Sequence, residues 1–332
     1  MEKRQLGNST LQVTRMGLGL AALGRPGYIN LGHASDLNHE YDVAAMEAHA
    51  HEVLDAAWAA GIRYFDAARS YGRAEAFLAS WLQKRQIAPS AVTIGSKWGY
   101  TYTADWQVTV PEGQQHEVKD LTLPVLQRQL RESRALLGEF LDLYQIHSAT
   151  LDSGVLENRA VLAELARLRN DGLAIGLSVS GPAQTAAIER ALAVLFDGVL
   201  LFAAVQATWN LLEQSATAAL QAAHEAGVGV IVKEALANGR LTERNPDPYF
   251  KARWAALPLA TWQIPVDALA LAAVSNQPFV DVILSGAAQV DHLQSNLKAL
   301  NVTWDSTLAA AVSDWGELPD VYWHKRTQLA WN

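Results

Sequence analysis

The chain contains no cysteine, and this single absence excludes several kinds of chemistry. Without thiols there are no disulfides, no cysteine nucleophile, no thiolate zinc site and no iron–sulfur cluster. Long apolar runs are missing too: no stretch of roughly 18 residues is free of charged or turn-forming residues, so we expect no membrane span. The opening residues lack the basic and then apolar pattern of an export signal. These absences together favour a cytoplasmic protein.

Positive charge is in the minority. Lys and Arg total 26 against 34 Asp and Glu, which gives a net charge of -8. Proteins that follow nucleic-acid phosphates usually carry the opposite excess, so we expect no nucleic-acid partner. The expected partner is a small-molecule substrate, and the charge gives no signal for an oligomeric state.

The order of the expected elements favours an α/β domain. Of the 332 residues, 50% are hydrophobic, and α/β barrels reach this length as one domain. Short runs of branched and aromatic residues, most of them ending in polar residues, predict buried strands. These runs are Met16–Gly24, Ile62–Gly72, Val92–Tyr100, Leu141–Ala149, Ile175–Gly181, Val199–Asn210, Val228–Ala235 and Val280–Ala288.

Segments of helical period lie between the strands, and several end at glycine, as Glu47–Gly61 and Asn158–Gly172 do. Repeated strand–helix units are typical of parallel sheets with right-handed crossovers. We therefore predict a single (β/α)8 TIM barrel over residues 1–332, with a doubly wound open sheet as the alternative. The segment KRQLGNSTLQVTR (Lys3–Arg15) predicts an N-terminal β-hairpin that plugs the bottom of the barrel.

Two connections are unusually long, Thr101–Leu123 and Leu236–Gln263. Each follows a strand, on the C-terminal face where barrel enzymes carry their active sites, so we expect lids over a substrate or cofactor. Aromatic residues expected to line such lids are Trp106, Tyr249, Phe250 and Trp254.

Chemistry-bearing side chains stand at successive strand ends. Asp66, Lys97 and His147 end the second, third and fourth predicted strands, and Tyr71 follows Asp66 on the connecting loop. A lysine at an apolar strand end needs a partner, and Asp66 is the obvious one. Because strand ends of a barrel converge on one rim, we expect these four side chains to meet.

Together the four groups make a proton-transfer device. An ordinary tyrosine has a pKa of about 10 and is a weak acid at neutral pH. A neighbouring lysine cation favours the phenolate of Tyr71, Asp66 holds Lys97, and His147 hydrogen-bonds the substrate oxygen. No side chain supplies a hydride, so a nicotinamide cofactor is the natural donor.

On these residues the chain resembles the aldo-keto reductase superfamily. The segments that carry the resemblance run from about Met16 to Leu300 and are GIRYFDAARSYG, SKWG, LDLYQIHSA, IGLS, VQATWNLLE and GAAQVDHLQSNL. The resemblance implies NAD(P)-dependent interconversion of carbonyls and alcohols, possible substrates being sugars or small aldehydes. It also implies that Tyr71 is the general acid/base, that Lys97 and Asp66 tune it, and that His147 orients the carbonyl.

The resemblance further implies a cofactor site, in which Ser178 and Gln206 bind the nicotinamide amide and Trp209 stacks on its ring. The segment Glu234–Leu241 is similar to the one that straps the pyrophosphate. The remaining implied cofactor residues are Leu236, Gly239, Leu241, Gly286, Gln289, His292 and Asn296. Trp98, Tyr100 and Trp106 are expected at the substrate pocket, where flat rings would suit a sugar.

Three departures from the family pattern bear on the cofactor. Val179 follows Ser178 where many relatives have Asn, and Glu234 stands where Ser is common. Ala288 occupies the place of an Arg that often clamps the 2′-phosphate of NADP, so NAD becomes plausible beside the NADP usual in the family.

Other motifs are weaker. Gly17-x-Gly19-x-x-Ala22 is a loose dinucleotide fingerprint, but breakers rather than a helix follow it, so we expect these glycines to relieve crowding in the first strand. His49 and His51 lack the spacing of a zinc-binding helix, because Asp55 stands four residues after His51, and no metal site is predicted.

Two other functions remain open. A Schiff-base lyase would use Lys97 as its nucleophile, and a redox-sensing protein would hold a nicotinamide with slow turnover.

Overall fold

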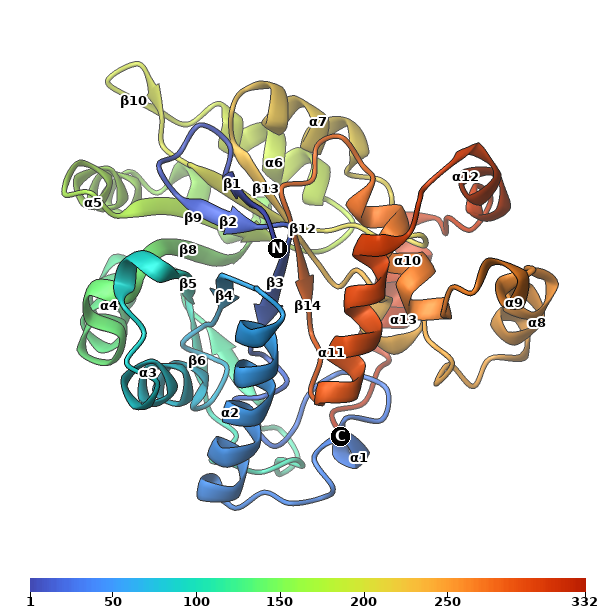
Figure 1. Ribbon diagram of the computed structural model, residues 1–332. Helices are drawn as coiled ribbons and strands as arrows, with labels where there is room; N and C mark the ends of the chain where they lie inside the picture. The colour runs from blue at the N-terminus through green and yellow to red at the C-terminus, as the bar shows by residue number, and fades with distance from the viewer.

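Eight parallel strands close into a barrel in the computed structural model, which describes residues 1–332 (Figure 1). Around the barrel they are β3 (Met16–Gly19), β4 (Tyr64–Asp66), β5 (Thr93–Trp98), β8 (Leu141–Ala149), β9 (Ala174–Val179), β12 (Ala204–Thr208), β13 (Gly229–Lys233) and β14 (Val282–Ser285). The parallel pairing of β14 with β3 closes the sheet. The predicted (β/α)8 barrel is therefore confirmed, and the open-sheet alternative is wrong.

Helices surround the barrel (Figure 1). Those that alternate with the strands are α2 (Val43–Ala59), α3 (Ala74–Lys84), α4 (Leu123–Leu137), α5 (Arg159–Asn170), α6 (Gln184–Leu192), α7 (Thr217–Glu225), α10 (Val266–Ser275) and α11 (Val290–Leu297). The others are α1 (His33–Asp36), α8 (Pro248–Ala256), α9 (Leu259–Trp262), α12 (Ser306–Val312) and α13 (Pro319–Thr327). No helix has both the length and the apolar character needed to cross a membrane.

Alternation along each strand decides which side chains face the barrel axis. In β5, Lys97 points inward to Asp66, whereas its neighbour Ser96 points outward and donates to Glu75 of α3 at 2.5 Å. Trp98 also points outward, into the apolar layer between strands and helices.

The N-terminal hairpin closes the bottom of the barrel, as predicted. Strands β1 (Lys3–Gln5) and β2 (Gln12–Thr14) pair antiparallel, and Leu6 and Val13 are completely buried in a cluster with barrel residues such as Ile231. The turn packs tightly, because a Cβ at Gly7 would lie 2.3 Å from the backbone nitrogen of Gly229.

The first strand is crowded at one of its two glycines. A Cβ at Gly17 would lie 2.7 Å from the Tyr64 ring, whereas one at Gly19 would make only ordinary contacts from 3.7 Å. The expectation of crowding is right for Gly17 and wrong for Gly19, which lies on the wall of the cavity described below.

The long connections carry their own structure. β6 (Tyr100–Tyr102) and β7 (Glu117–Lys119) form an antiparallel pair within the first, and the second contains α8 and α9. The prediction that aromatic residues of this connection line a lid is wrong. Phe250 and Trp254 pack with Trp315 in a separate core, and Tyr249 is exposed. A third hairpin, β10 (Leu195–Phe196) with β11 (Val199–Leu200), comes just before β12, at the end of the barrel opposite the C-terminal strand ends, and projects outward at the top left of Figure 1.

Candidate active site

The four predicted catalytic side chains meet at the C-terminal end of the barrel strands. Lys97 Nζ forms an ion pair with Asp66 Oδ2 and lies 4.8 Å from the centre of the Tyr71 ring. The Tyr71 and His147 rings meet edge to face, with centroids 5.4 Å apart and planes at 84°. The structure therefore brings together a carboxylate, an ammonium, a phenol and an imidazole.

Asp66 is saturated with hydrogen bonds. Its Oδ1 accepts from the Tyr64 hydroxyl at 3.2 Å and from the amides of Gln145 and Gln206, each at 3.1 Å. Lys97 has a second acceptor, the carbonyl oxygen of Ala67, at 3.0 Å. Both charged groups are buried, so this network fixes the lysine in one position beneath the Tyr71 ring.

Burial dominates the acid–base behaviour of the other two groups. Burial raises the pKa of Tyr71, and Asp66 raises it further, whereas Arg25 lowers it. Burial also lowers the pKa of His147 well below its usual value, with Lys97 and other nearby cations acting in the same direction. His147 is thus a neutral imidazole at pH 7. Its Nδ1 lies 3.5 Å from Ser70 Oγ, which leaves Nε2 as the nitrogen available to a ligand.

A cavity of about 780 Å³ runs from this constellation along the rim of the barrel. Tyr71 and His147 line one end, and His292 and Asn296 of α11 line the other. Its size lies in the range of protein pockets that hold cofactors and drug-sized ligands. One cavity therefore joins the predicted catalytic groups to the predicted cofactor-binding stretch.

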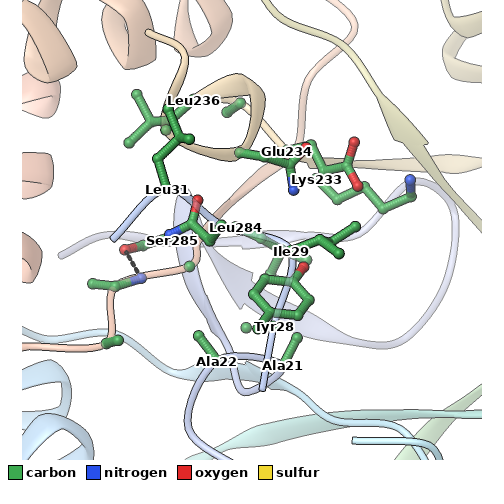
Figure 2. Close-up of a pocket in the computed structure, with 18 of the residues that line it drawn as sticks. Ala21, Ala22, Tyr28, Ile29, Leu31, Lys233, Glu234, Leu236, Leu284 and Ser285 are labelled. Carbon is green, nitrogen blue, oxygen red and sulfur yellow. Dashed lines mark hydrogen bonds between the residues drawn. The ribbon is translucent and has the colours of Figure 1, made fainter. Parts of the chain in front are cut away.

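Two loops close over the cavity. The loop after β3 contacts the loop after β13, where Leu31 N donates to the carbonyl oxygen of Asn238 at 3.1 Å. Figure 2 shows Leu31 beside Leu236 on the cavity wall, with Ser285 of β14 nearby. Arg244 crosses from the second loop to Asp36 in α1, with contacts of 2.8 and 2.5 Å to its two carboxylate oxygens.

The cavity suits a dinucleotide. Asn238 has a positive φ, as its neighbour Ala237 does, and its buried Oδ1 has no partner in the protein although the residue lines the cavity. Gly286 lines the cavity with open space where a Cβ would stand. An orphaned acceptor and an open backbone surface are what a bound ligand with hydroxyl or amide donors would complete.

Most predicted cofactor residues lie on the cavity wall. They are Gln206, Glu234, Leu236, Gly239, Gly286, His292 and Asn296. The Asn296 amide is 2.9 Å from Ser285 Oγ, and His292 Nε2 is 2.9 Å from Arg244 Nη2.

Four predicted cofactor residues lie off the wall. Trp209 is buried in the core, where its Nε1 donates to Thr217 at 2.9 Å. Trp209 follows directly after β12 and its ring packs against Phe279, with centroids 5.9 Å apart, whereas Gln206 within the strand faces Asp66. Ser178 is buried and accepts from the backbone of Ser148 at 2.8 Å; Ser180 lines the cavity instead.

The other two support the loops from behind. Leu241 is buried in the core that contains Trp315. Gln289 donates to the backbone oxygen of Asp36 at 3.0 Å, so it holds the loop after β3 in place.

The predicted substrate residues divide in the same way. Tyr100 lines the cavity, and its ring meets His147 at 5.0 Å between centroids. Trp98 is fully buried behind the barrel wall because it follows the inward-facing Lys97, so its placement at the substrate pocket is wrong. Trp106 is also off the cavity, with its Nε1 donating to the carbonyl oxygen of Tyr41 at 2.6 Å.

The structure explains why a glutamate can stand at position 234, where many relatives have Ser. Arg326 of α13 holds both of its oxygens, with Nε 3.0 Å from each. Burial alone would raise the pKa of Glu234, but Arg326 and Lys233 outweigh burial and lower it to about 2. The ion pair therefore anchors the last helix at the cavity rim.

Several cavity residues have little sequence signal. Arg25 lies among turn residues, and Asp36 and Arg244 meet across 208 positions of the chain. Trp331, near the C-terminus, lines the cavity and stacks on His116 with ring centroids 4.0 Å apart. Arg25 alone has a local signal, since it is an isolated charge in the glycine- and proline-rich segment that follows β3.

Known proteins match this chain in sequence and in fold. It is 28% identical over 264 residues to a D-threo-aldose 1-dehydrogenase of a Pseudomonas species, a match that covers 74% of this chain and 75% of that protein. It is 36% identical over 104 residues to a pyridoxal 4-dehydrogenase of Microbacterium luteolum, covering 31% of this chain but only 25% of that protein.

The holo form of the aldo-keto reductase AKR11C1 from Bacillus halodurans has the same fold. The TM-score is 0.70 at 22% identity, covering 96% of this chain and 97% of that one. The sequence model described as Aldo/keto reductase family matches residues 15–315. The chain therefore belongs to the aldo/keto reductase family of NAD(P)-dependent oxidoreductases, which interconvert carbonyl groups and alcohols.

Proposed function

We propose that this chain reduces polar aldehydes, aldoses among them, and oxidises the matching alcohols, with Tyr71 as the proton donor and acceptor. The observation that carries the proposal is the single cavity lined by Tyr71 and His147 at one end and by the Asn296 region at the other. A nicotinamide cofactor bound along it would supply the hydride to the carbonyl carbon.

The residues of the chain supply the proton and the geometry. The neutral His147 donates a hydrogen bond to the carbonyl oxygen and orients the substrate. As negative charge develops on that oxygen, the Tyr71 hydroxyl gives up its proton to it. Lys97 lies beneath the ring, where its charge stabilises the phenolate that remains, and Asp66 keeps Lys97 in place.

For the cofactor we propose NAD rather than NADP. Ala288 lies on the cavity wall and offers no cation for a 2′-phosphate. The buried carboxylate of Asp36 lies on the same wall, and its Oδ2 is 3.9 Å from His292 Nδ1. Arg244, the nearby cation, already has both terminal nitrogens on Asp36. Because Arg244 and Asp36 neutralise each other, this part of the wall presents no free cation to a 2′-phosphate, while the carboxylate oxygens can still accept hydrogen bonds from ribose hydroxyls.

For the substrate, a hydroxylated aldehyde fits the mixed walls near Tyr71. Trp331 and Tyr100 offer flat faces, while Arg25 and Glu117 offer a donor and an acceptor within the same cavity. The sequence relative that oxidises an aldose and the one that oxidises pyridoxal, by their names, act on polar substrates of this kind.

The geometry disfavours the two alternative functions. A Schiff-base lyase needs a lysine that reaches the substrate, but Lys97 is fully buried, bonded to Asp66 and Ala67, and absent from the cavity wall. A slow redox sensor has no need for the Tyr71–His147 pair that faces the ligand.

A screen of aldehydes, ketones and aldoses, followed at 340 nm with NADH and NADPH in both directions, tests the proposal. We expect turnover with at least one hydroxylated aldehyde and a lower dissociation constant for NADH than for NADPH. Cofactor binding without turnover on any carbonyl would favour the sensor, and borohydride-trapped substrate on Lys97 would favour the lyase.

A further inference from the structure

Arg25 is a buried cation in the cavity wall, separate from the four predicted catalytic side chains. Only 2% of the residue is exposed. Its Nη1 donates to the carbonyl oxygen of Ser70 and to Glu117 Oε2, both at 2.9 Å, and its buried Nε has no partner. Burying a guanidinium is costly unless its charge is used or fully compensated.

The guanidinium faces the predicted proton donor. The Arg25 Cζ lies 5.2 Å from the centre of the Tyr71 ring, as near as it lies to the Tyr28 ring, and 4.8 Å from the Trp331 ring. The bond to Ser70 holds the backbone immediately before Tyr71, so Arg25 fixes both the position of the ring and the charge beside it.

Other charges around Tyr71 are largely paired. Lys97 lies 4.8 Å from the same ring, and the equally buried carboxylate of Asp66 offsets part of the stabilisation that the lysine gives to the phenolate. Glu117, the partner of Arg25, has a side chain 24% exposed, so water screens it more than it screens the buried guanidinium. Arg25 therefore contributes positive charge that its partner only partly cancels.

The remaining groups near Tyr71 are Tyr28, Glu234 and His147. Tyr28 stays a neutral phenol because burial raises its pKa. Glu234 opposes the charge of Arg25, but Arg326 holds both of its oxygens. His147, from β8, is neutral at pH 7 because burial and nearby cations lower its pKa.

We propose that Arg25 is a positioning residue for Tyr71, which it holds through Ser70, and that its positive charge, limited by Glu117, stabilises the phenolate during proton transfer. This inference rests on the proposed function, since it acts through Tyr71.

Alcohol oxidation with excess NAD⁺ gives the sharpest readout, because Tyr71 must then be a phenolate. Below the pKa of Tyr71 the rate follows the phenolate fraction, so a shift of one pH unit changes the rate about tenfold. The probe is the alcohol of the best aldehyde from the screen, measured between pH 6 and 10.

Two substitutions should shift the profile in opposite directions. Arg25→Met removes the cation, raises the pKa of Tyr71 and should slow oxidation by about threefold to tenfold at pH 8. Glu117→Gln removes the opposing charge and should speed oxidation by up to about threefold at the same pH. Arg25→Lys keeps the charge, so its pH profile should stay near that of the unmodified protein. Its KM for the alcohol should rise, because Arg25 is also proposed as a hydrogen-bond donor to the substrate.

Opposite shifts support the inference, because a merely structural role would slow both variants without moving their profiles apart. Profiles that coincide with the unmodified one, in variants whose melting temperatures are preserved, overturn it. If Arg25→Met does not fold, Arg25→Gln takes its place, because its amide can still donate to the carbonyl oxygen of Ser70 while the charge is removed. A Tyr71→Phe variant that remains active would instead overturn the proposed function.

Discussion

The carboxylate of Glu234 is held at both oxygens by the guanidinium of Arg326, which ties α13 to the end of β13. The Glu234 side chain is 8% exposed and that of Arg326 is 23% exposed. The anchored residues after α13 then pass over the cavity, where the backbones of Tyr28 and Asn332 exchange hydrogen bonds of 3.1 and 3.2 Å.

Breaking this pair should destabilise the protein. Glu234→Gln leaves a mostly buried guanidinium without its charge partner, at a cost of about 3 kcal/mol. Chemical denaturation followed by tryptophan fluorescence measures this cost. The matched control is Glu164→Gln, whose partner Arg167 is 55% exposed, and it should cost less than about 1 kcal/mol. Equal losses in the two variants would contradict the anchoring role.

The same pair gives the stability a pH dependence. The pKa of Glu234 in the folded protein is about 2, below its value in an unfolded chain of about 4.3. A lowered folded pKa contributes stability that is present above about pH 5 and is lost as the pH falls towards 2. Melting temperatures of the unmodified protein and Glu234→Gln should therefore converge as the pH falls through this window.

Cofactor choice should respond to position 288. Ala288→Arg places a guanidinium on the cavity wall, and we expect the NADPH to NADH affinity ratio to rise about tenfold or more. Ala288→Met, of similar length and without charge, controls for the bulk of the side chain. Fluorescence titration of each variant with both reduced cofactors measures the ratio. An unchanged ratio in Ala288→Arg would mean that the 2′ position of the cofactor lies elsewhere.

Trp98 and Tyr100 should behave differently although they are near neighbours in sequence. Trp98→Phe removes buried volume without breaking a hydrogen bond, since Nε1 has no partner, so we expect a stability loss of about 1–3 kcal/mol with an unchanged KM. Tyr100→Ala removes a ring from the cavity wall and should raise KM for the aldehyde several-fold. A raised KM for Trp98→Phe would place that residue back at the substrate.

Much of this architecture is readable from the sequence, because buried parallel strands and amphipathic helices follow simple periodic rules. Asp66, Lys97 and His147 could be placed for the same reason, since each stands at or near the C-terminal end of a buried strand. Alternation along β5 also predicts that the Trp98 side chain points away from the barrel axis, because the neighbouring Lys97 points towards it.

The parts that escaped prediction depend on long-range packing. Asp36 and Arg244 come from loops without periodicity, and nothing local indicates that they meet. The sequence shows that Arg25 is an isolated charge, but it does not show that the side chain lies beside Tyr71. Trp331 lies at the cavity because the segment after α13 is held by the Glu234–Arg326 pair and by the backbone bonds between Asn332 and Tyr28, contacts that no local pattern indicates.

The most direct test of the central role of Tyr71 is the Tyr71→Phe variant, measured for turnover and for NADH binding together. We predict that kcat for aldehyde reduction falls by about a hundredfold or more while the NADH dissociation constant changes less than about twofold, because only proton transfer is lost. Tyr144→Phe, which removes a buried hydroxyl outside the cavity, should retain its kcat. An unchanged kcat in Tyr71→Phe would contradict the account.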